Sequence, residues 1–249
     1  MDDKKTGFST IVLAAGKGTR MKSDIAKVLH PLGGRPLLSW PLKAAREAGA
    51  SRIVVVIGHQ GERIRALFQE PDLIFAEQKE LRGTGHAVLQ AREAFEGLNE
   101  EIVILCGDVP LIKPSTISAL FEKRRKDQAA VTVLTTVVDN PVGYGRVIKS
   151  GDGQIARIVE EKDASKEEKL VREINTGIYC VESPFLFTAV ASLGDRNAQR
   201  EYYLTDIVEI ACKKGLLATA LTVSDPAEAA GINTPEDLQR AALLLANHP

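Results

Sequence analysis

The most informative stretch of the sequence is Ile11–Leu38, IVLAAGKGTRMKSDIAKVLHPLGGRPLL. In it an apolar segment, typical of a strand, is followed directly by a glycine-containing loop that carries two cations. The first three residues are apolar without alternation, which is typical of a strand buried on both faces of a parallel sheet. Gly16 and Gly18 then leave backbone amides exposed, and successive amides form a concave anion site. Arg20 adds a forked guanidinium and Lys27 a point charge, both suited to phosphate oxygens. This order predicts a polyphosphate site.

Two familiar glycine motifs do not account for this loop. A dinucleotide-binding fingerprint needs a third glycine where this chain has Met21, and the P-loop pattern G-x-x-x-x-G-K-[ST] occurs nowhere in the sequence. What remains is L-A-A-G-K-G-T-R-M, in which Thr19 adds a hydroxyl donor, followed by Lys27 in K-V-L-H-P-L. This arrangement resembles the signature of the nucleotidyltransferases that make nucleoside-diphosphate sugars. A tight strand-to-helix turn with two incidental cations is the alternative interpretation.

Length and composition limit the class of protein. A chain of 249 residues predicts one large domain, or a domain with a lobe, because hydrophobic cores stop growing near about 250 to 300 residues. A net charge of −1 supplies no basic field, so we expect no nucleic-acid partner. No apolar run approaches the roughly 18 residues of a membrane span and the N-terminus has no apolar signal core, so we expect neither membrane insertion nor secretion. Three scattered cysteines indicate reduced thiols and a cytoplasmic protein.

Strands and helices alternate in the first half of the chain, which argues for βαβ units and a mainly parallel sheet. Apolar runs predict strands at residues 53–57, 73–76 and 102–106, and helical patterns predict helices at 62–69 and 85–95. A further helix is expected at Pro36–Ala48, with Pro36 in its first position. Together these elements predict an α/β protein with a mostly parallel central sheet, and the resemblance implies a three-layer, Rossmann-like nucleotidyltransferase fold.

The second half changes to strands separated by glycine turns, which indicates a smaller mixed extension. Strands are expected at residues 131–138, 145–149, 155–159 and 174–182, and helices at 203–213 and 235–247. Residues 163–172 are charged and predict a solvated loop or a short surface helix. With the resemblance, this pattern implies one nucleotidyltransferase domain over residues 1–249, with a nucleotide-binding part at about 7–130, a sugar-binding part at about 131–233 and a C-terminal helix at about 234–247.

Asp108 follows the strand expected at 102–106 and precedes Pro110, which restricts the backbone. Ligands of open α/β sheets bind beyond the carboxyl ends of the strands, so the loops after Leu13 and after Cys106 should share one edge of the sheet. Mg²⁺ prefers one or two protein oxygens together with phosphate oxygens and water. A single carboxylate at this place is therefore a reasonable anchor for Mg²⁺, and a turn aspartate is the alternative.

Further motifs extend the resemblance over nearly all 249 residues. They are G-D-V-P-L at 107–111, E-Q-x-x-x-x-G-T-G-H-A at 77–87, G-Y-G-R at 143–146, I-V-E-E-K-D at 158–163, E-I-N-T-G-I at 173–178, N-A-Q-R-E-Y-Y-L-T-D at 197–206 and G-I-N at 231–233. With these motifs and the opening loop, the chain resembles the family of uridyltransferase domains of bacterial N-acetylglucosamine-1-phosphate uridyltransferases.

This resemblance implies a site residue by residue. The residues implied for the nucleotide are Leu13, Ala14, Gly16, Gly18, Thr19, Gln78, Gly83 and Thr84. Those implied for the sugar are Gly145, Glu160, Asn175 and Thr176, with Glu160 preferred to Glu161 only by its place in the family motif. The implied catalytic cations are Arg20, on the leaving β,γ-phosphates, and Lys27, on the phosphates around the reacting centre. The implied ligands of the cofactor Mg²⁺ are Asp108 and Asn233, although an asparagine before a helix could equally be a cap.

The implied enzyme is a UDP-N-acetylglucosamine diphosphorylase of cell-wall precursor synthesis. It would join UTP and N-acetylglucosamine 1-phosphate, by attack of a phosphate oxygen on the α-phosphorus of UTP, to give UDP-N-acetylglucosamine and pyrophosphate. Two alternatives stay open: a UTP or dTTP glucose-1-phosphate nucleotidyltransferase, and a non-catalytic nucleotide-sugar-binding regulatory protein. The presence of Arg20, Lys27, Asp108 and Asn233 together argues against the second.

Three departures from the family pattern accompany the resemblance. Ala26 stands where the family usually has a proline before the lysine, which loosens that turn, and Cys106 replaces an aromatic residue. The hexapeptide-repeat acetyltransferase domain of the family is missing after residue 249. We therefore expect either a natural single-activity enzyme or an excised domain, without the usual trimer-forming element, and the oligomeric state stays open.

Overall fold

The computed structural model describes residues 7–151 and 153–247. Its strands are β1 (Ser9–Ala14), β2 (Pro31–Leu32), β3 (Arg35–Pro36), β4 (Arg52–Ile57), β5 (Leu73–Glu77), β6 (Glu101–Cys106), β7 (Val131–Val137), β8 (Arg146–Lys149), β9 (Ile155–Val159), β10 (Glu173–Glu182) and β11 (Ala218–Val223). Its α-helices are α1 (Ser39–Glu47), α2 (Gly61–Leu67), α3 (Thr84–Gln90), α4 (Pro114–Asp127), α5 (Ser183–Ala191), α6 (Asp206–Lys213) and α7 (Pro235–Asn247). Its 3₁₀ turns are η1 (Thr19–Met21), η2 (Lys27–Leu29), η3 (Arg92–Phe95), η4 (Glu168–Leu170) and η5 (Pro226–Ala229).

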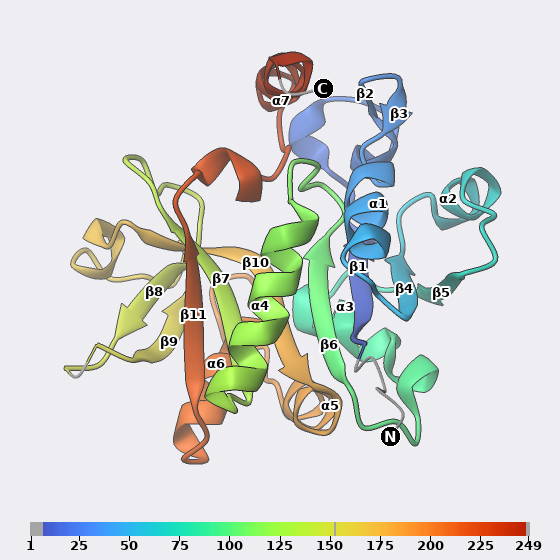
Figure 1. The fold of residues 1–249 in the computed structure, drawn as a ribbon. Coiled ribbons are helices and arrows are strands. Elements are labelled where there is room, and N and C mark those ends of the chain that lie inside the picture. Colours follow the sequence, from blue (N-terminus) through green and yellow to red (C-terminus); the bar gives the residue numbers. More distant parts are fainter. Residues whose placement is uncertain (1–6, 152, 248–249) are drawn as a thin grey trace.

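The main sheet runs in the order β11-β7-β10-β6-β1-β4-β5 (Figure 1). Neighbouring strands are parallel except where β10 meets β7 and β6, and β8 makes antiparallel pairs with β10 and β9. Leu13 in β1 lies opposite Cys106 in β6, and the Gly107 amide donates to the Leu13 carbonyl at 2.9 Å. The predicted phosphate loop and the predicted metal ligand therefore follow strands that end level with each other. The expected α/β fold with a mostly parallel sheet is confirmed.

Helices cover both faces of the sheet. Successive strand residues point to opposite sides, so an unbroken apolar strand presents apolar side chains to the helices on each face. Ile11 packs into the core on the side of α3, α5 and α6, whereas Val12 packs into the core on the side of α1 and α4. In Figure 1, α1 and α4 lie in front of the sheet and α5 lies behind it. Both residues are fully buried, as is the whole run Ile102–Leu105 in β6. Burial on two sides explains the unbroken apolar runs that predict these strands.

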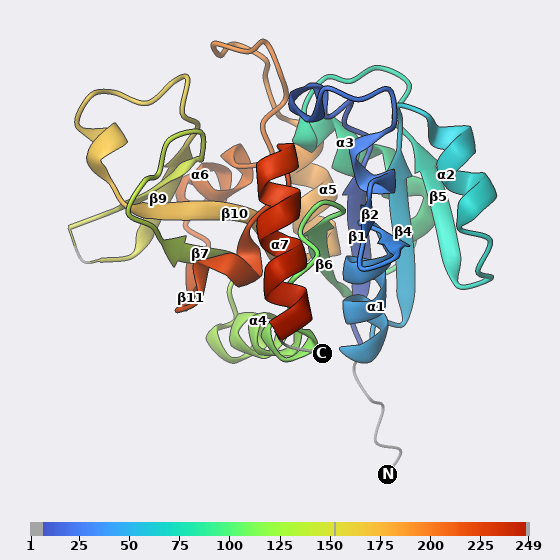
Figure 2. The ribbon, with the colours of Figure 1, turned by 90° about the horizontal axis from the view of Figure 1, so that it is seen from above.

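The last helix, α7, brings a distant segment to the carboxyl end of the sheet, where it lies at the top of Figure 1 and nearest the viewer in Figure 2. It packs against the β2–β3 hairpin through a small core of Met21, Leu32, Leu37, Ile232 and Ala241. The Ile232 amide also donates to the Asp108 carbonyl at 2.8 Å. Residue 233 is thereby fixed beside the end of β6. None of the helices in the described part of the chain is long and apolar enough to span a membrane.

The predicted start of the first long helix is wrong. Pro36 does not begin a helix but pairs with Pro31 in the β2–β3 hairpin, and α1 begins at Ser39. The Leu38 amide donates to the Val28 carbonyl at 3.0 Å, so the chain is tied to the neighbouring η2 turn before the helix starts. A tertiary contact has overridden the usual preference of proline for the first helical turn.

Other boundaries also differ from the prediction. The helix expected at 85–95 is divided between α3 and η3, and the helix expected at 203–213 begins at Asp206. Helices α4 and α5 and strand β11 are absent from the prediction. β11 is an edge strand with the mixed sequence A-T-A-L-T-V, and its pairing partner β7 is far away in the sequence. β7 and β10 share one sheet with β6, so the strands show no boundary near residue 130. The division into nucleotide and sugar parts at that residue stays a prediction.

Leu105 and Leu243 provide a matched test of this core. Leu105 is fully buried in β6, whereas Leu243 on α7 is 68% exposed. Leu105→Ala should lower the free energy of unfolding by about 2–5 kcal/mol, because it removes buried methyl groups and leaves a cavity. Leu243→Ala should change it by less than about 0.5 kcal/mol. Urea unfolding followed by circular dichroism measures both, and equal losses would contradict the described packing.

Candidate active site

The loop after β1 is shaped around Lys27. Gly18 has a φ of +64°, which favours glycine, and a Cβ at this position would lie 2.4 Å from the Cβ of Lys27. The η1 turn follows at once and leaves Thr19 and Arg20 exposed. Because Gly18 has no side chain, the lysine segment packs directly against the predicted phosphate loop.

The predicted cations and metal ligands form one hydrogen-bonded cluster, which we call the cation cluster: Arg20, Lys27, Asp108 and Asn233. Arg20 Nη2 and Lys27 Nζ each donate to Asn233 Oδ1, both at 2.9 Å. Lys27 Nζ also donates to Asp108 Oδ2, with which it forms an ion pair. Arg20 and Asn233 are 213 positions apart in the sequence. The sequence predicts these four residues one by one, and the fold brings them to one point.

Asp108 and Asn233 could hold a divalent cation. Their side-chain oxygens already share one cationic group, the Lys27 ammonium. A carboxylate and an amide oxygen beside a phosphate site match the ligands that Mg²⁺ prefers. Within residues 7–151 and 153–247, no group of three or more His, Cys, Asp or Glu side chains could hold a metal ion. Mg²⁺ at a site with one or two protein oxygens usually completes its coordination with phosphate oxygens and water.

A cavity of about 450 Å³ lies next to the cation cluster, at the carboxyl ends of β1, β5 and β6. Lys27 and Asp108 belong to its lining. Every residue predicted for the nucleotide lines it as well: Leu13, Ala14, Gly16, Gly18, Thr19, Gln78, Gly83 and Thr84. Its volume lies within the range of about 300–1,000 Å³ that is usual for small-molecule sites.

Gln78 is a buried polar side chain on the wall of this cavity. Its Nε2 donates to the Gly83 carbonyl at 3.0 Å and lies 3.0 Å from Nδ1 of His86, so the amide nitrogen faces the protein. This orientation leaves the amide oxygen as the acceptor for a ligand. Gly83 has a φ of +100°, and a Cβ there would lie 2.7 Å from the Tyr202 carbonyl. Glycine at this position lets the loop that carries Tyr202 pack onto the wall.

Three residues predicted for the sugar lie together. A Cβ at Gly145 would be 3.5 Å from Glu160 Oε2 and 3.6 Å from the Cβ of Asn175. Glu160 Oε1 accepts from Thr205 Oγ1 at 3.1 Å. Burial raises the pKa of the Glu160 carboxyl, and the Thr205 hydrogen bond opposes that rise. Asn175 Oδ1 already accepts from the Gly177 amide at 3.0 Å, so Glu160 Oε2 and the Asn175 amide nitrogen are the groups beside Gly145 that can serve as acceptor and donor for sugar hydroxyls.

Glu161 and Thr176 have other partners. Glu161 Oε2 accepts from Arg146 Nη2 at 2.6 Å, and this buried guanidinium holds the pKa of Glu161 below its usual range. Thr176 Oγ1 donates to the Leu134 carbonyl at 2.7 Å and is buried between β10 and β7. The geometry therefore favours Glu160 over Glu161 as the carboxylate that faces a sugar, while the Thr176 hydroxyl is already engaged inside the sheet.

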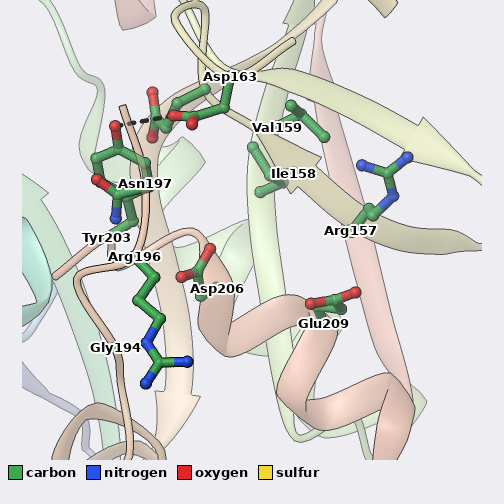
Figure 3. A pocket seen from close by; sticks show the side chains of 11 residues that line it. Arg157, Ile158, Val159, Asp163, Gly194, Arg196, Asn197, Tyr203, Asp206 and Glu209 are labelled. Carbon is green, nitrogen blue, oxygen red and sulfur yellow. Dashed lines mark hydrogen bonds between the residues drawn. The ribbon is translucent and has the colours of Figure 1, made fainter. Parts of the chain in front are cut away.

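A second cavity, of about 310 Å³, is lined by Glu160, one of the residues predicted for the sugar, and is rich in charge (Figure 3). Its charged lining residues are Arg157, Glu160, Asp163, Arg196, Asp206 and Glu209. Tyr203 Oη donates to Asp163 Oδ2 at 3.0 Å, the contact drawn as a dashed line in Figure 3. Burial raises the pKa of Asp206 to about 6, and the negative charges of Glu209 and Asp163 add to the rise.

A distant loop adds residues that the sequence does not single out. Glu201 lines the nucleotide cavity. The Gly85 amide donates to the Tyr202 carbonyl and the Tyr202 amide donates to the Arg82 carbonyl, both at 2.8 Å. The Arg82 guanidinium also lies 4.8 Å from the centroid of the Tyr202 ring. Glu201 belongs to the motif at 197–206, but no local signal predicts which loop this motif meets.

Residues 10–174 match the family of MobA-like NTP transferase domains, and the chain therefore belongs to this family of nucleotidyltransferases. It is 52% identical over 238 residues to a protein of Geotalea daltonii named bifunctional protein GlmU, a match over 95% of this chain and 52% of the relative. A protein of the same name from Geotalea uraniireducens is 55% identical over 239 residues, or 96% of this chain and 52% of the relative. The chain spans about half the length of these curated relatives. A solved UDP-glucose pyrophosphorylase complexed with UDP-glucose shares the fold, with a TM-score of 0.77 and 21% identity over 98% of this chain and 100% of that chain.

The raised pKa of Asp206 predicts a dependence of stability on pH. Its folded-state pKa of about 6 lies above the ordinary value of 3.8, so stability falls as pH rises from the lower value through the higher one. Asp206→Asn should therefore raise the free energy of unfolding near neutral pH by about 1 kcal/mol, less than the full linkage value because the side chain is partly exposed. The gain should fall to near zero by about pH 2.5, where Asp206 is protonated in both the folded and the unfolded state. Urea unfolding at the two pH values measures this, and a gain that does not change with pH would contradict it.

Proposed function

We propose that this protein is an N-acetylglucosamine-1-phosphate uridyltransferase. It joins UTP and N-acetylglucosamine 1-phosphate to give UDP-N-acetylglucosamine and pyrophosphate. The observation that carries the proposal is the cation cluster of Arg20, Lys27, Asp108 and Asn233 beside the nucleotide cavity. Transfer of a nucleotidyl group to a sugar phosphate needs cations and alignment rather than an enzyme nucleophile, because the sugar phosphate is itself an anionic nucleophile.

The cations address the two sources of the barrier, which are repulsion between the anionic substrates and charge that builds on the leaving pyrophosphate. We assign Arg20, which is exposed on η1, to the leaving β- and γ-phosphates. We assign Lys27, whose ammonium contacts Asp108 and Asn233, to the phosphates around the reacting centre. Mg²⁺ held by Asp108 and Asn233 would neutralise phosphate oxygens and orient them.

Gln78 supports a uracil-type base. Its amide nitrogen faces Gly83 and His86, which leaves the amide oxygen to accept from the imide N–H of uracil. Cytosine carries an acceptor at that ring position, so it would oppose the same oxygen. Thymine has the same imide as uracil, and for this reason dTTP belongs in the experimental comparison.

Glu160 and Asn175 support the sugar side of the proposal. Their carboxylate and amide flank Gly145 and can bind ring hydroxyls and an N-acetyl group. The motifs shared with the uridyltransferase domain family contain these residues, and the relatives named bifunctional protein GlmU match 95–96% of this chain at 52–55% identity. The UDP-glucose pyrophosphorylase shares only the fold, at 21% identity. We therefore place N-acetylglucosamine 1-phosphate before glucose 1-phosphate.

Pyrophosphate release tests the proposal directly. UTP, dTTP, CTP and GTP are each paired with N-acetylglucosamine 1-phosphate or glucose 1-phosphate, with and without Mg²⁺. UTP with N-acetylglucosamine 1-phosphate should give the highest kcat/KM, by about 10-fold or more over glucose 1-phosphate, and release should cease without Mg²⁺. Preference for glucose 1-phosphate would replace the proposal with that activity. Binding of a nucleotide sugar without release from any pair would indicate a regulatory protein.

Single substitutions test the roles of the two cations. Lys27→Ala and Arg20→Ala should each lower kcat by about 10²-fold or more, because each removes a positive charge from the phosphates in the transition state. Lys22→Ala, at an exposed lysine outside the cation cluster, is the matched control and should keep the parent kcat. Circular dichroism and thermal unfolding verify that all variants are folded. Nearly normal release by the Lys27 and Arg20 variants would overturn their assignment.

A further inference from the structure

Gln60 lies outside the nucleotide cavity, yet its backbone adopts a conformation that calls for an explanation. It is the residue between β4 and α2 that precedes the first turn of α2, with φ of 55° and ψ of 34°. This left-handed region is favoured by glycine and is strained for a residue with a long side chain. Such strain persists where the surroundings determine it, and it concentrates at functional sites.

The side chain of Gln60 binds the backbone of the segment that leads to Lys27. Its Oε1 accepts from the Ala26 amide at 3.0 Å, and its Nε2 donates to the Asp24 carbonyl. Ala26 is fully buried and immediately precedes Lys27, the first residue of η2. Both ends of one amide group thus hold the chain just before the lysine. We call this pair of contacts the Gln60 clamp.

The turn that carries Gln60 is itself fixed to the cavity walls. The His59 amide donates to the Ala15 carbonyl at 3.1 Å. A Cβ at Gly58 would lie 2.9 Å from that same carbonyl and 3.0 Å from the Gln78 carbonyl, so the turn packs closely against both. The Gln60 clamp therefore sets the position of Ala26 relative to the phosphate loop and the wall that carries Gln78.

Lys27 needs support of this kind. Residues 22–24 before it are exposed, and its side chain must pass Gly18 to bring the ammonium to Asp108 and Asn233. A displacement of about 1 Å in a group that contacts reacting atoms costs about 10²-fold in rate. A small shift of the backbone at residue 26 would be passed directly to the next residue.

We propose that Gln60 is a positioning residue for Lys27. The Gln60 clamp fixes residues 24–26 and thereby determines where the Lys27 ammonium meets the phosphates. Gln60 acts only through Lys27 and does not line the nucleotide cavity. The inference rests on the proposed function, because it takes Lys27 as a catalytic cation.

Gln60→Gly distinguishes the role of the side-chain hydrogen bonds from the role of the left-handed backbone turn. Glycine removes both hydrogen bonds but favours the left-handed backbone, so a residue that served the turn alone would tolerate the change. The clamp predicts a fall in kcat of about 10-fold or more, with KM for UTP changed by less than about 3-fold. Gln128→Gly is the matched control, since Gln128 directly follows α4 with φ of 51° and ψ of 35° and lies outside the nucleotide cavity. It should keep the parent kcat.

A second substitution tests whether the loss comes from the loop. Ala26 has a φ of −52°, which proline can adopt, but proline has no amide to donate to Gln60. In the Gln60→Gly background, Ala26→Pro stiffens the same segment by another means and should raise kcat by about 3-fold or more. Ala26→Pro alone should lower kcat, because Oε1 of Gln60 then faces the proline ring. This opposite sign in the two backgrounds is a coupling that independent effects would not produce.

Hydrogen–deuterium exchange gives a readout that does not depend on turnover. Exchange in a peptide covering residues 22–30 should rise in Gln60→Gly and stay at the parent level in Gln128→Gly. If the parent protein releases no pyrophosphate from any substrate pair, the proposed function fails, and exchange still reports on the clamp. If the parent is active and Gln60→Gly keeps the parent kcat, the positioning role is refuted. A loss of kcat without raised exchange in this peptide would refute it as well.

Discussion

β1 and β6 end side by side at the same edge of the sheet, and this alignment determines where the site lies. The two strands pair in parallel from Ser9 and Ile102 to Leu13 and Cys106, and the hydrogen bond from the Gly107 amide to the Leu13 carbonyl, at 2.9 Å, continues this pairing to their ends. The phosphate loop leaves one strand and Asp108 leaves the other, so their side chains meet without any need to attract each other. Packing of α7 on the β2–β3 hairpin adds Asn233 at the same edge. Apolar burial thus places a polar site.

The cation cluster contains more positive than negative charges. Two cations, Arg20 and Lys27, face one carboxylate, Asp108, so one positive charge remains when no ligand is considered. Asn233 accepts from both cations through one amide oxygen and does so without cancelling their charge. An aspartate in its place would neutralise the cluster and weaken its attraction for a polyanion. The amide therefore orders the two long side chains and keeps them available to phosphate.

Local patterns explain what the sequence could predict. Unbroken apolar runs, the glycines after them and Asp108 at a strand end are features of short segments, and the fold class and a phosphate site follow from them. Asn233 was implied only by the family resemblance, and the fold brings it to the cation cluster from a distant segment. The contacts that the sequence could not predict join distant segments. Tyr202 pairs with residues 82–85, and Gln60 binds residues 24–26, through contacts that no periodicity encodes. Ala26 marked the lysine turn as unusual in the sequence, but only the structure shows that a glutamine holds it.

The wrong helix start at Pro36 has the same physical origin, because contacts outside the local pattern decide the outcome. Pro36 has the right residue type for a helix start, yet the β2–β3 hairpin requires it as a strand residue. The Thr176 hydroxyl, which the resemblance implies for the sugar, donates to the Leu134 carbonyl inside the sheet, and its role toward a sugar stays a prediction. In both cases residue type and motif were informative about location but not about which partner the group would meet.

The long separation between Arg20 and Asn233 has a consequence for the growing chain. The two residues share a hydrogen bond across 213 positions. At the usual rate of synthesis, roughly 10 to 40 seconds pass between the addition of the first and that of the second. During that time the phosphate loop has already been made, but the residue that aligns its cations does not yet exist. A ribosome-bound chain therefore cannot present a completed phosphate site until residue 233 has emerged, which keeps nascent molecules from holding nucleotide in a reactive arrangement.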